Sequence, residues 1–82
     1  MAYYLYIARC ADKTLYTGIT TDLARRLDEH NDGVAGAKYT RARRPVRLIY
    51  SKRFKDRSKA SCAEAAVKKL SRVQKLALVR GS

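Results

Sequence analysis

The chain has 82 residues, of which 46% are hydrophobic, so it can form one domain with a modest core and is not expected to be disordered. Its formal net charge is +12, and the excess lies in one part, because residues 1–32 carry −1 and residues 33–82 carry +13. This asymmetry excludes an acidic or neutral surface over most of the chain. It favours a polyanionic partner, with nucleic acid ahead of a membrane.

We expect no targeting or membrane segment. The apolar stretches are short, and Met1-Ala2-Tyr3 lacks the basic leader of a signal peptide. Cys10 and Cys62 form no CxxC pair, and with a single histidine they cannot complete a structural zinc site. These features predict a cytoplasmic protein with reduced cysteines and no membrane contact.

The first 19 residues predict an antiparallel hairpin. Residues 3–8 and 14–19 are rich in aromatic and β-branched residues, and a short polar turn separates them. Because strand side chains alternate between faces, Tyr4 and Tyr6 share one face, and Tyr16 and Gly18 share one face of the second strand. Gly18 is expected to let a phosphate or a helix approach closely.

A helix is predicted next, with Thr20, Thr21 or Asp22 as its N-cap and its end near Asn31. Arg26 and His30, four residues apart, lie on one face of this helix. A flexible loop is expected over residues 33–38. The basic loop, residues 38–44, follows it, and its candidate nucleic-acid contacts are Lys38, Tyr39, Arg41, Arg43 and Arg44.

The last part predicts a strand and two helices. Residues 46–54 read as a strand that is apolar enough at its start for a central position in the sheet. A helix beginning at Asp56 or Ser58 has an apolar stripe, and a final helix begins at the capping box of Ser71 and Gln74. We expect the stripe to contain Ala60, Ala63, Val67 and Leu70, and the apolar face of the final helix to contain Val73, Leu76, Ala77 and Val79.

The order β-β-α-β-α-α predicts an α/β (α+β) fold with a small, three-stranded, mostly antiparallel sheet flanked by helices. No linker or internal repeat divides the chain, so residues 1–82 are expected to form a single domain.

The order of the motifs resembles the GIY-YIG nuclease superfamily. Tyr4-Leu5-Tyr6 stands where the family has Gly-Ile-Tyr, and Tyr16-Thr17-Gly18 stands where it has Tyr-Ile-Gly. Arg26, His30 and Glu64 fit the family's arginine, histidine and metal-binding glutamate. The strings around Leu15–Leu23, residues 37–40 and residues 69–72 are similar to its small stand-alone bacterial (YhbQ-like) branch.

The resemblance implies a site for cutting phosphodiesters. Glu64 would hold Mg²⁺ or Mn²⁺, since one carboxylate with waters and a substrate phosphate is an ordinary magnesium site. Arg26 would bind the scissile phosphate, and His30 would hydrogen-bond a tyrosine hydroxyl or the phosphate. Tyr6 or Tyr16 would position or deprotonate the attacking water, and the second role requires a lowered phenol pKa.

Each of these residues also has a purely structural or solvent-exposed interpretation. Glu64 and Arg26 could be solvated helix residues, His30 a helix cap, and the tyrosines core aromatics. The basic loop could be a solvated surface, although a like-charge cluster without a neighbouring acid would repel itself.

The leading hypothesis is a metal-dependent DNA endonuclease, a monomer or weak dimer, acting on structured or single-stranded DNA in repair or processing. The main alternative is a non-catalytic or weakly active nucleic-acid-binding module. It is favoured by Ser61-Cys62, which replace the branch's usual Leu-Arg pair, and by the absence of an asparagine after Asn31. A third hypothesis, an adaptor on a repair complex, requires an exposed apolar patch that the sequence does not indicate.

Overall fold

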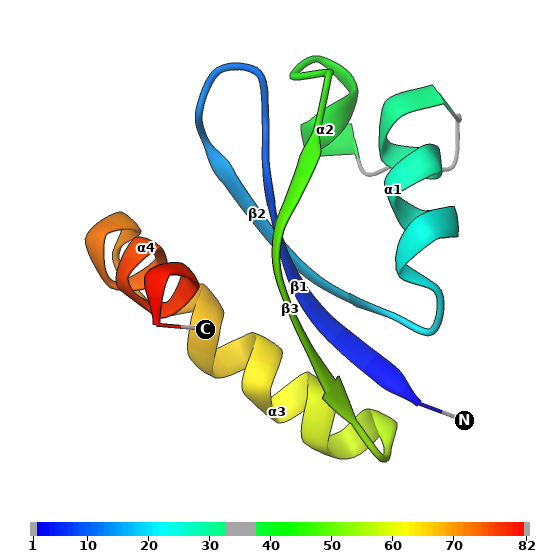
Figure 1. Ribbon diagram of the computed structural model, residues 1–82, viewed down its shortest axis with the longest axis vertical. Helices are drawn as coiled ribbons and strands as arrows, with labels where there is room; N and C mark the ends of the chain where they lie inside the picture. The colour runs from blue at the N-terminus through cyan, green and yellow to red at the C-terminus, as the bar shows by residue number, and fades with distance from the viewer. Residues whose placement is uncertain (1, 33–37, 82) are drawn as a thin grey trace.

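The computed structural model describes residues 2–32 and 38–81 (Figure 1). The predicted flexible loop lies almost entirely outside these residues. The predicted order of strands and helices is confirmed, with one short helix added inside the basic loop. The elements are β1 (Tyr3–Arg9), β2 (Leu15–Thr20), α1 (Leu23–Asp32), α2 (Lys38–Arg41), β3 (Arg47–Phe54), α3 (Arg57–Lys68) and α4 (Arg72–Arg80).

The three strands form an antiparallel sheet in the order β2-β1-β3. The prediction of a central position for β3 is wrong, since β1 is central and β3 is an edge strand. The cause is visible in the second half of β3, where Ser51, Lys52 and Arg53 are all exposed, whereas Leu5, Tyr6, Ile7 and Ala8 of β1 are all buried.

The register of β1 and β2 places the motif tyrosines on one face. Tyr6 pairs with Gly18 and Ala8 pairs with Tyr16, so these four residues point to the same side of the sheet. The alternation predicted for both strands is therefore what the hairpin adopts.

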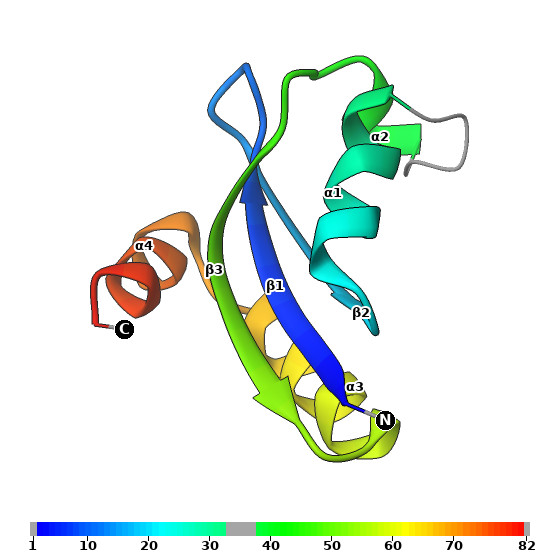
Figure 2. The ribbon, with the colours of Figure 1, turned by 45° about the vertical axis from the view of Figure 1, so that its right-hand side comes forward.

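Helices cover both faces of the sheet (Figure 2). On one face Leu5 and Ile7 pack with Val67 of α3 and with residues of α4. On the other face Tyr6 and Ala8 pack with Cys10 and Val46, and Leu23 and Leu27 of α1 lie against them. The result is a three-layer arrangement in which β1 supplies side chains to both core clusters.

Short polar contacts fix the ends of α1. The Asp22 carboxylate accepts a hydrogen bond from the Arg25 amide at 3.0 Å, which makes Asp22 the N-cap. Near the other end, the Asn31 side chain donates to the Val46 carbonyl and accepts from the Val46 amide. Asn31 thus ties the end of α1 to the residue that precedes β3.

The predicted starts of the last two helices are confirmed. The Asp56 side chain caps α3, and Ser71 with Gln74 forms a complete capping box on α4. The Arg72 guanidinium also donates to the carbonyl of Lys13 in the hairpin turn. This bond holds α4 against the β1–β2 turn, 59 residues away in sequence.

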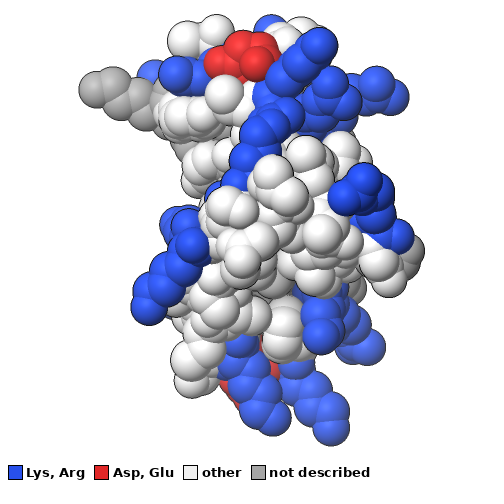
Figure 3. Space-filling view, turned by 90° about the vertical axis from the view of Figure 1, so that its left-hand side faces the viewer, with Lys and Arg blue, Asp and Glu red and all other residues white. Residues whose placement is uncertain are grey.

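The predicted apolar face of α4 is partly wrong. Leu78 and Val79 contact the core, whereas Val73 is 72% exposed and Ala77 is also exposed. Val73, Leu76 and Val79 line an open apolar depression beside Arg80. The structure therefore has an exposed apolar patch that the sequence did not indicate. The cause is that α4 meets the sheet on another side than its pattern implied. Figure 3 shows the side of the molecule that carries α4, where uncharged surface lies between Lys and Arg side chains.

Cys10 is buried and Cys62 is exposed, and neither forms a disulfide. Among the described residues, no helix has the length and the apolar character needed to cross a membrane.

Thr17 generates a stability prediction. Its side chain is 4% exposed, and its hydroxyl is the one buried side-chain polar atom of the described residues without a hydrogen-bond partner. Such a group costs about 1–3 kcal/mol. Thr17→Val keeps the shape and removes the hydroxyl, so we expect the melting temperature to rise by about 4 °C or more.

Thr40→Val is the matched control, because the Thr40 hydroxyl is bonded to His30 at 2.8 Å. Thermal unfolding by circular dichroism should show Thr40→Val destabilised and Thr17→Val stabilised. A Thr17→Val variant that melts below the wild type would show that its hydroxyl is satisfied in solution.

Candidate active site

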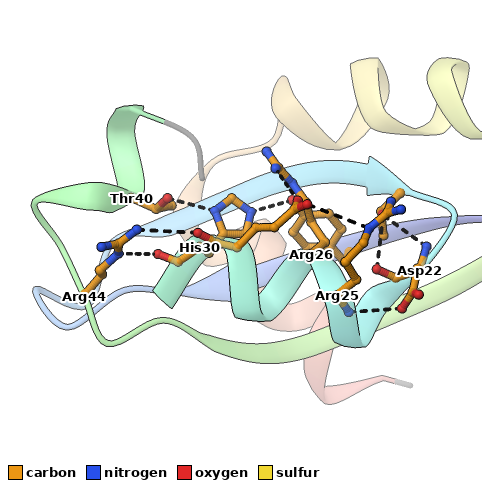
Figure 4. Close-up of polar contacts among 9 residues, drawn as sticks. Asp22, Arg25, Arg26, His30, Thr40 and Arg44 are labelled. Atoms are coloured by element: carbon orange, nitrogen blue, oxygen red, sulfur yellow. Dashed lines mark hydrogen bonds and ion pairs between the residues drawn. The ribbon is translucent and has the colours of Figure 1, made fainter. Parts of the chain in front are cut away.

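A buried line of hydrogen bonds joins β1, α1 and α2. The Tyr6 hydroxyl lies 2.8 Å from Nε2 of His30, and Nδ1 of His30 lies 2.8 Å from the Thr40 hydroxyl. His30 and Thr40 are fully buried, and Tyr6 is 3% exposed. Figure 4 shows His30 between its two partners, with Thr40 reaching it from α2. His30 is therefore neither a surface residue nor a simple helix cap.

His30 is held as a neutral imidazole. Burial lowers its pKa, and the nearby positive charges of Arg26 and Arg44 lower it further, against the opposing effect of Glu29. A neutral imidazole has one donor and one acceptor nitrogen. Each ring nitrogen here faces a hydroxyl, so either tautomer satisfies both bonds, and the line can shift its protons without losing a hydrogen bond.

Tyr6 does not have the lowered pKa that a base role requires. Burial raises the pKa of Tyr6 to about 12, and the hydrogen bond from the Arg26 side chain offsets only part of that rise. Tyr6 is thus a neutral phenol at physiological pH. Arg26 alone therefore does not give Tyr6 the lowered pKa that the role of a base requires, because the effect of burial outweighs that of the guanidinium.

Gly18 provides room for Tyr6. Its backbone conformation is ordinary, so the need for glycine is spatial. A Cβ atom at this position would lie 2.7 Å from the Tyr6 hydroxyl oxygen and 2.9 Å from Cζ. The nearest neighbour is therefore the tyrosine ring of the first motif and not a helix.

Tyr16 extends the cluster toward solvent. Its ring meets His30 edge-on at 5.1 Å and stacks with Tyr39 at 6.1 Å between centroids. The Arg43 guanidinium lies 4.0 Å from the centre of the Tyr39 ring. Tyr16 is half-buried whereas Tyr6 is buried, so the two motif tyrosines differ in their access to a substrate.

Arg26 lies between the buried cluster and an open groove. Its guanidinium donates to Glu29 at 2.9 Å and contacts the Tyr6 hydroxyl. The groove has a volume of about 290 Å³. Its lining comes from the start of β1, from the end of β2 and the residue after it, from α1 and from the start of α3: Tyr3, Ile19, Thr20, Thr21, Arg25, Arg26, Glu29 and Arg57. Three arginines therefore face a space where a phosphate could bind.

Glu64 belongs to α3, which packs on the other face of the sheet from α1. Arg57, Glu64 and Lys68 lie seven and four residues apart on α3, so they share one helix face. Arg57 lines the groove at the end of β2, and Lys68 lines a second groove at its start. Glu64 lies between them along the helix. Its charge is among those that raise the pKa of Tyr6, which places it within electrostatic range of the cluster.

The site therefore straddles the outer edge of β2. Tyr16 and Arg26 reach this edge from one face of the sheet, and the Arg57–Glu64–Lys68 stripe of α3 reaches it from the other. In the part of the chain that the structure describes, β2 pairs with β1 alone, so its outer edge carries no further strand.

The residues near this edge suit a metal held mainly by water and phosphate. Glu64 presents one part-exposed carboxylate, which pairs with Lys68 at 3.5 Å. Within residues 2–32 and 38–81, no group of three or more His, Cys, Asp or Glu side chains gathers as a metal cluster. A single hard oxygen ligand fits Mg²⁺ or Mn²⁺ with most of its coordination supplied from outside the protein.

Two arginines of the basic loop are engaged inside the protein. Arg44 donates to the carbonyls of Glu29 and His30 at the end of α1, as Figure 4 shows for its bond to His30. Arg43 forms a salt bridge with Asp12 at 2.9 Å. The premise that no acid lies near this loop is wrong, because the hairpin turn brings Asp12 to it. Arg41 is exposed at the end of α2.

Three residues that hold the candidate site residues in place were not among those predicted from the sequence: Glu29, Thr40 and Asp12. Glu29 could have been found from its spacing, since it lies three residues after Arg26 on the same helix face. Thr40 and Asp12 carry no such signal, because their partners lie 10 and 31 residues away and depend on the tertiary fold.

The chain is similar to several known proteins. The sequence profile described as "GIY-YIG catalytic domain" matches residues 2–77. UPF0213 protein DP2720 of Desulfotalea psychrophila is 56% identical over 81 residues, which cover 99% of this chain and 74% of that protein. UPF0213 protein SAG0778 of Streptococcus agalactiae is 52% identical over 77 residues, which cover 94% of this chain and 86% of that protein.

Two solution NMR structures are also similar. UPF0213 protein BH0048 from Bacillus halodurans has a TM-score of 0.63 at 45% identity, with 98% of this chain and 84% of that chain covered. Protein EF2693 from E. faecalis has a TM-score of 0.64 at 47% identity, with 95% and 83% covered. The resemblance inferred from the motifs and the predicted fold are confirmed.

Gly18→Ala should disrupt the buried line. The new methyl group would overlap the Tyr6 hydroxyl, so the ring must move away from His30. We expect a loss of about 1–3 kcal/mol in the free energy of unfolding, measured by urea denaturation. Gly81→Ala is the control, because its Cβ would have no neighbour closer than 3.4 Å. Equal stability of the two variants would contradict the packing role of Gly18.

Stability should fall on mild acidification. The pKa of His30 is lower in the folded protein than in the unfolded chain, so the unfolded chain binds the extra proton first. The stabilisation that neutral His30 contributes to the free energy of unfolding is complete above about pH 6.5, and it is lost as the pH falls toward the folded-state pKa. Melting temperatures between pH 7.5 and 5.5 should decline for the wild type and less steeply for His30→Gln. Parallel profiles would assign the acid sensitivity to another group.

Proposed function

Because the chain belongs to the GIY-YIG family, as one of its small UPF0213 proteins, we propose that it is a metal-dependent DNA endonuclease that hydrolyses phosphodiester bonds. The observation that supports this proposal is that Arg26 and Tyr16 line two grooves along β2, while Glu64 lies on α3 between Arg57 and Lys68, which line the same two grooves. DNA repair or processing is the context that such an activity would serve.

In this proposal the two tyrosines have different roles. Tyr16 is accessible, so its hydroxyl is the one that can touch the attacking water or the phosphate. Tyr6 and His30 are buried and act as positioning residues, because they hold Arg26 and the Tyr16 ring through direct contacts. The neutral state of His30 suits this role, since a buried imidazolium beside Arg26 would repel it.

Arg26 is the residue that would receive the negative charge of the reacting phosphate. Its fork already contacts Tyr6 and Glu29, so its orientation is largely fixed before a substrate arrives. A donor fixed in advance stabilises developing charge without the cost of reorganisation. Arg25 and Arg57 in the same groove would hold the phosphates on either side.

Glu64 would supply the protein ligand to Mg²⁺ or Mn²⁺. A divalent ion at this carboxylate supplies charge stabilisation for the leaving oxygen. Lys68, four residues along α3, would keep the carboxylate oriented toward the β2 edge through their ion pair. The contact is weak in water, so a metal can replace Lys68 as the partner of Glu64.

The nucleic-acid-binding module remains the alternative function. The same grooves and the same excess of positive charge would serve it without turnover. Binding without cleavage on single-stranded, nicked and branched DNA, in Mg²⁺ and in Mn²⁺, would favour that alternative over the endonuclease.

Glu64→Gln separates the two functions. The change keeps the size and removes the charge that would hold the metal, so cleavage of these three DNA substrates should fall about a hundredfold or more. DNA affinity without metal should stay level or rise slightly, since one repulsive carboxylate is gone. Gel-based cleavage and fluorescence anisotropy measure the two quantities.

Asp28→Asn is the matched control, because Asp28 is an exposed residue of α1 that lines neither groove, and the substitution removes the same charge. It should leave cleavage close to wild type. Metal-dependent cleavage that survives Glu64→Gln would place the catalytic centre elsewhere.

A further inference from the structure

A second groove opens directly beside Tyr16, on the other side from the Arg26 groove along β2. It has a volume of about 300 Å³ and lies between β2, α2, α3 and α4. Its lining residues are Leu15, Tyr16, Thr17, Tyr39, Lys68 and Lys75. Tyr16 therefore contacts Tyr6 and His30 of the candidate site and also forms part of the wall of this groove.

The chemistry of the groove is cationic and aromatic. Lys68 and Lys75 approach it from two different helices, and none of the described lining residues is acidic. Glu64 is paired with Lys68 at 3.5 Å but does not line the groove. Leu15 and the stacked rings of Tyr16 and Tyr39 form the apolar part. Two ammonium groups suit phosphate oxygens, and an aromatic and aliphatic wall suits a sugar and a base.

The parts of this groove are held in place before any ligand binds. The Tyr39 ring is fixed by Tyr16 stacked on it and by the Arg43 guanidinium, which is itself paired with Asp12. On the α4 side, the capping box fixes the first turn, and Arg72 ties that turn to the Lys13 carbonyl. Lys75, in the next turn, is therefore presented from a fixed backbone.

We propose that this groove binds one unpaired nucleotide of the substrate strand, next to the phosphate held at the β2 edge. The proposal rests on the proposed function, because it assigns a neighbouring position on the same strand. Lys75 and Lys68 contact the phosphate of this nucleotide, and its base lies against Leu15 and the edges of Tyr16 and Tyr39. The Arg43 side chain already occupies one side of the Tyr39 ring.

The size of the groove favours an unpaired nucleotide over a duplex. About 300 Å³ is at the low end of ligand pockets, enough for one nucleotide. A paired base is stacked inside the double helix and can enter such a pocket only after extrusion, which costs a few kcal/mol. The substrate class that fits is DNA with a single-stranded segment, such as an overhang or a flap.

Lys75→Ala tests this subsite, since alanine favours the helix and removes the ammonium group together with its aliphatic stem. In metal-free buffer, the affinity for a single-stranded oligothymidylate should fall about threefold to tenfold, with the salt-dependence slope reduced by about 0.7. Affinity for a blunt duplex should change much less. Lys75→Arg should restore most of the single-strand affinity.

Lys59→Ala is the matched control, because Lys59 is an exposed lysine of α3 outside both grooves. A loss in Lys75→Ala no larger than in Lys59→Ala would overturn the subsite. Equal losses on single-stranded and duplex DNA would overturn its preference for an unpaired nucleotide. All these readouts are binding constants without metal, so a failure here is distinct from a failure of cleavage in the Glu64→Gln experiment.

Discussion

The hydrogen bond between Tyr6 and His30 is the interaction on which the candidate site depends. It joins the central strand to α1, and the second nitrogen of His30 extends it to α2. Gly18 leaves room for it, the Arg26 side chain is hydrogen-bonded to Tyr6, and the Tyr16 ring packs edge-on against His30. Buried polar bonds of this kind specify one arrangement, because any other leaves polar groups without partners.

The few carboxylates near the site are distributed against a large positive background. Asp12 pairs with Arg43, Glu29 with Arg26, and Glu64 with Lys68. Each acid thus fixes a cation that faces a groove or the aromatic cluster. In the proposed function, Arg26 and Lys68 contact phosphates from these fixed positions, and the remaining basic residues are left to interact with the rest of the polyanion.

The sequence predicted the fold well because its signals were local. Alternation in the first hairpin, the cap at Asp22 and the capping box at Ser71 each depend on neighbours within a few residues, and the structure confirms them. The central position assigned to β3 was wrong, since apolar content does not determine strand order. The predicted apolar face of α4 was partly wrong, because the contact of α4 with the rest of the fold is set by the Arg72 hydrogen bond and by packing.

The residues of the candidate site could be proposed from the motifs, but their burial, contacts and protonation could not. Motif order located Tyr6, Tyr16, Arg26, His30 and Glu64, and the comparisons confirm the family to which that order points. The burial of Tyr6, which raises its pKa to about 12, follows only from the packing of three elements. The same holds for Arg44, whose side chain serves the end of α1.

The exposed edge strand β3 has a consequence for self-association. An unpaired strand edge can template pairing with another copy of the chain, and charged side chains are a common defence against it. Arg47, Lys52 and Arg53 are exposed on this edge. Their mutual repulsion between molecules is weakened by salt and cancelled by a bound polyanion. Self-association of the protein should therefore be strongest at the ratio of nucleic acid to protein that neutralises the positive charge, because little net charge then remains to repel other copies.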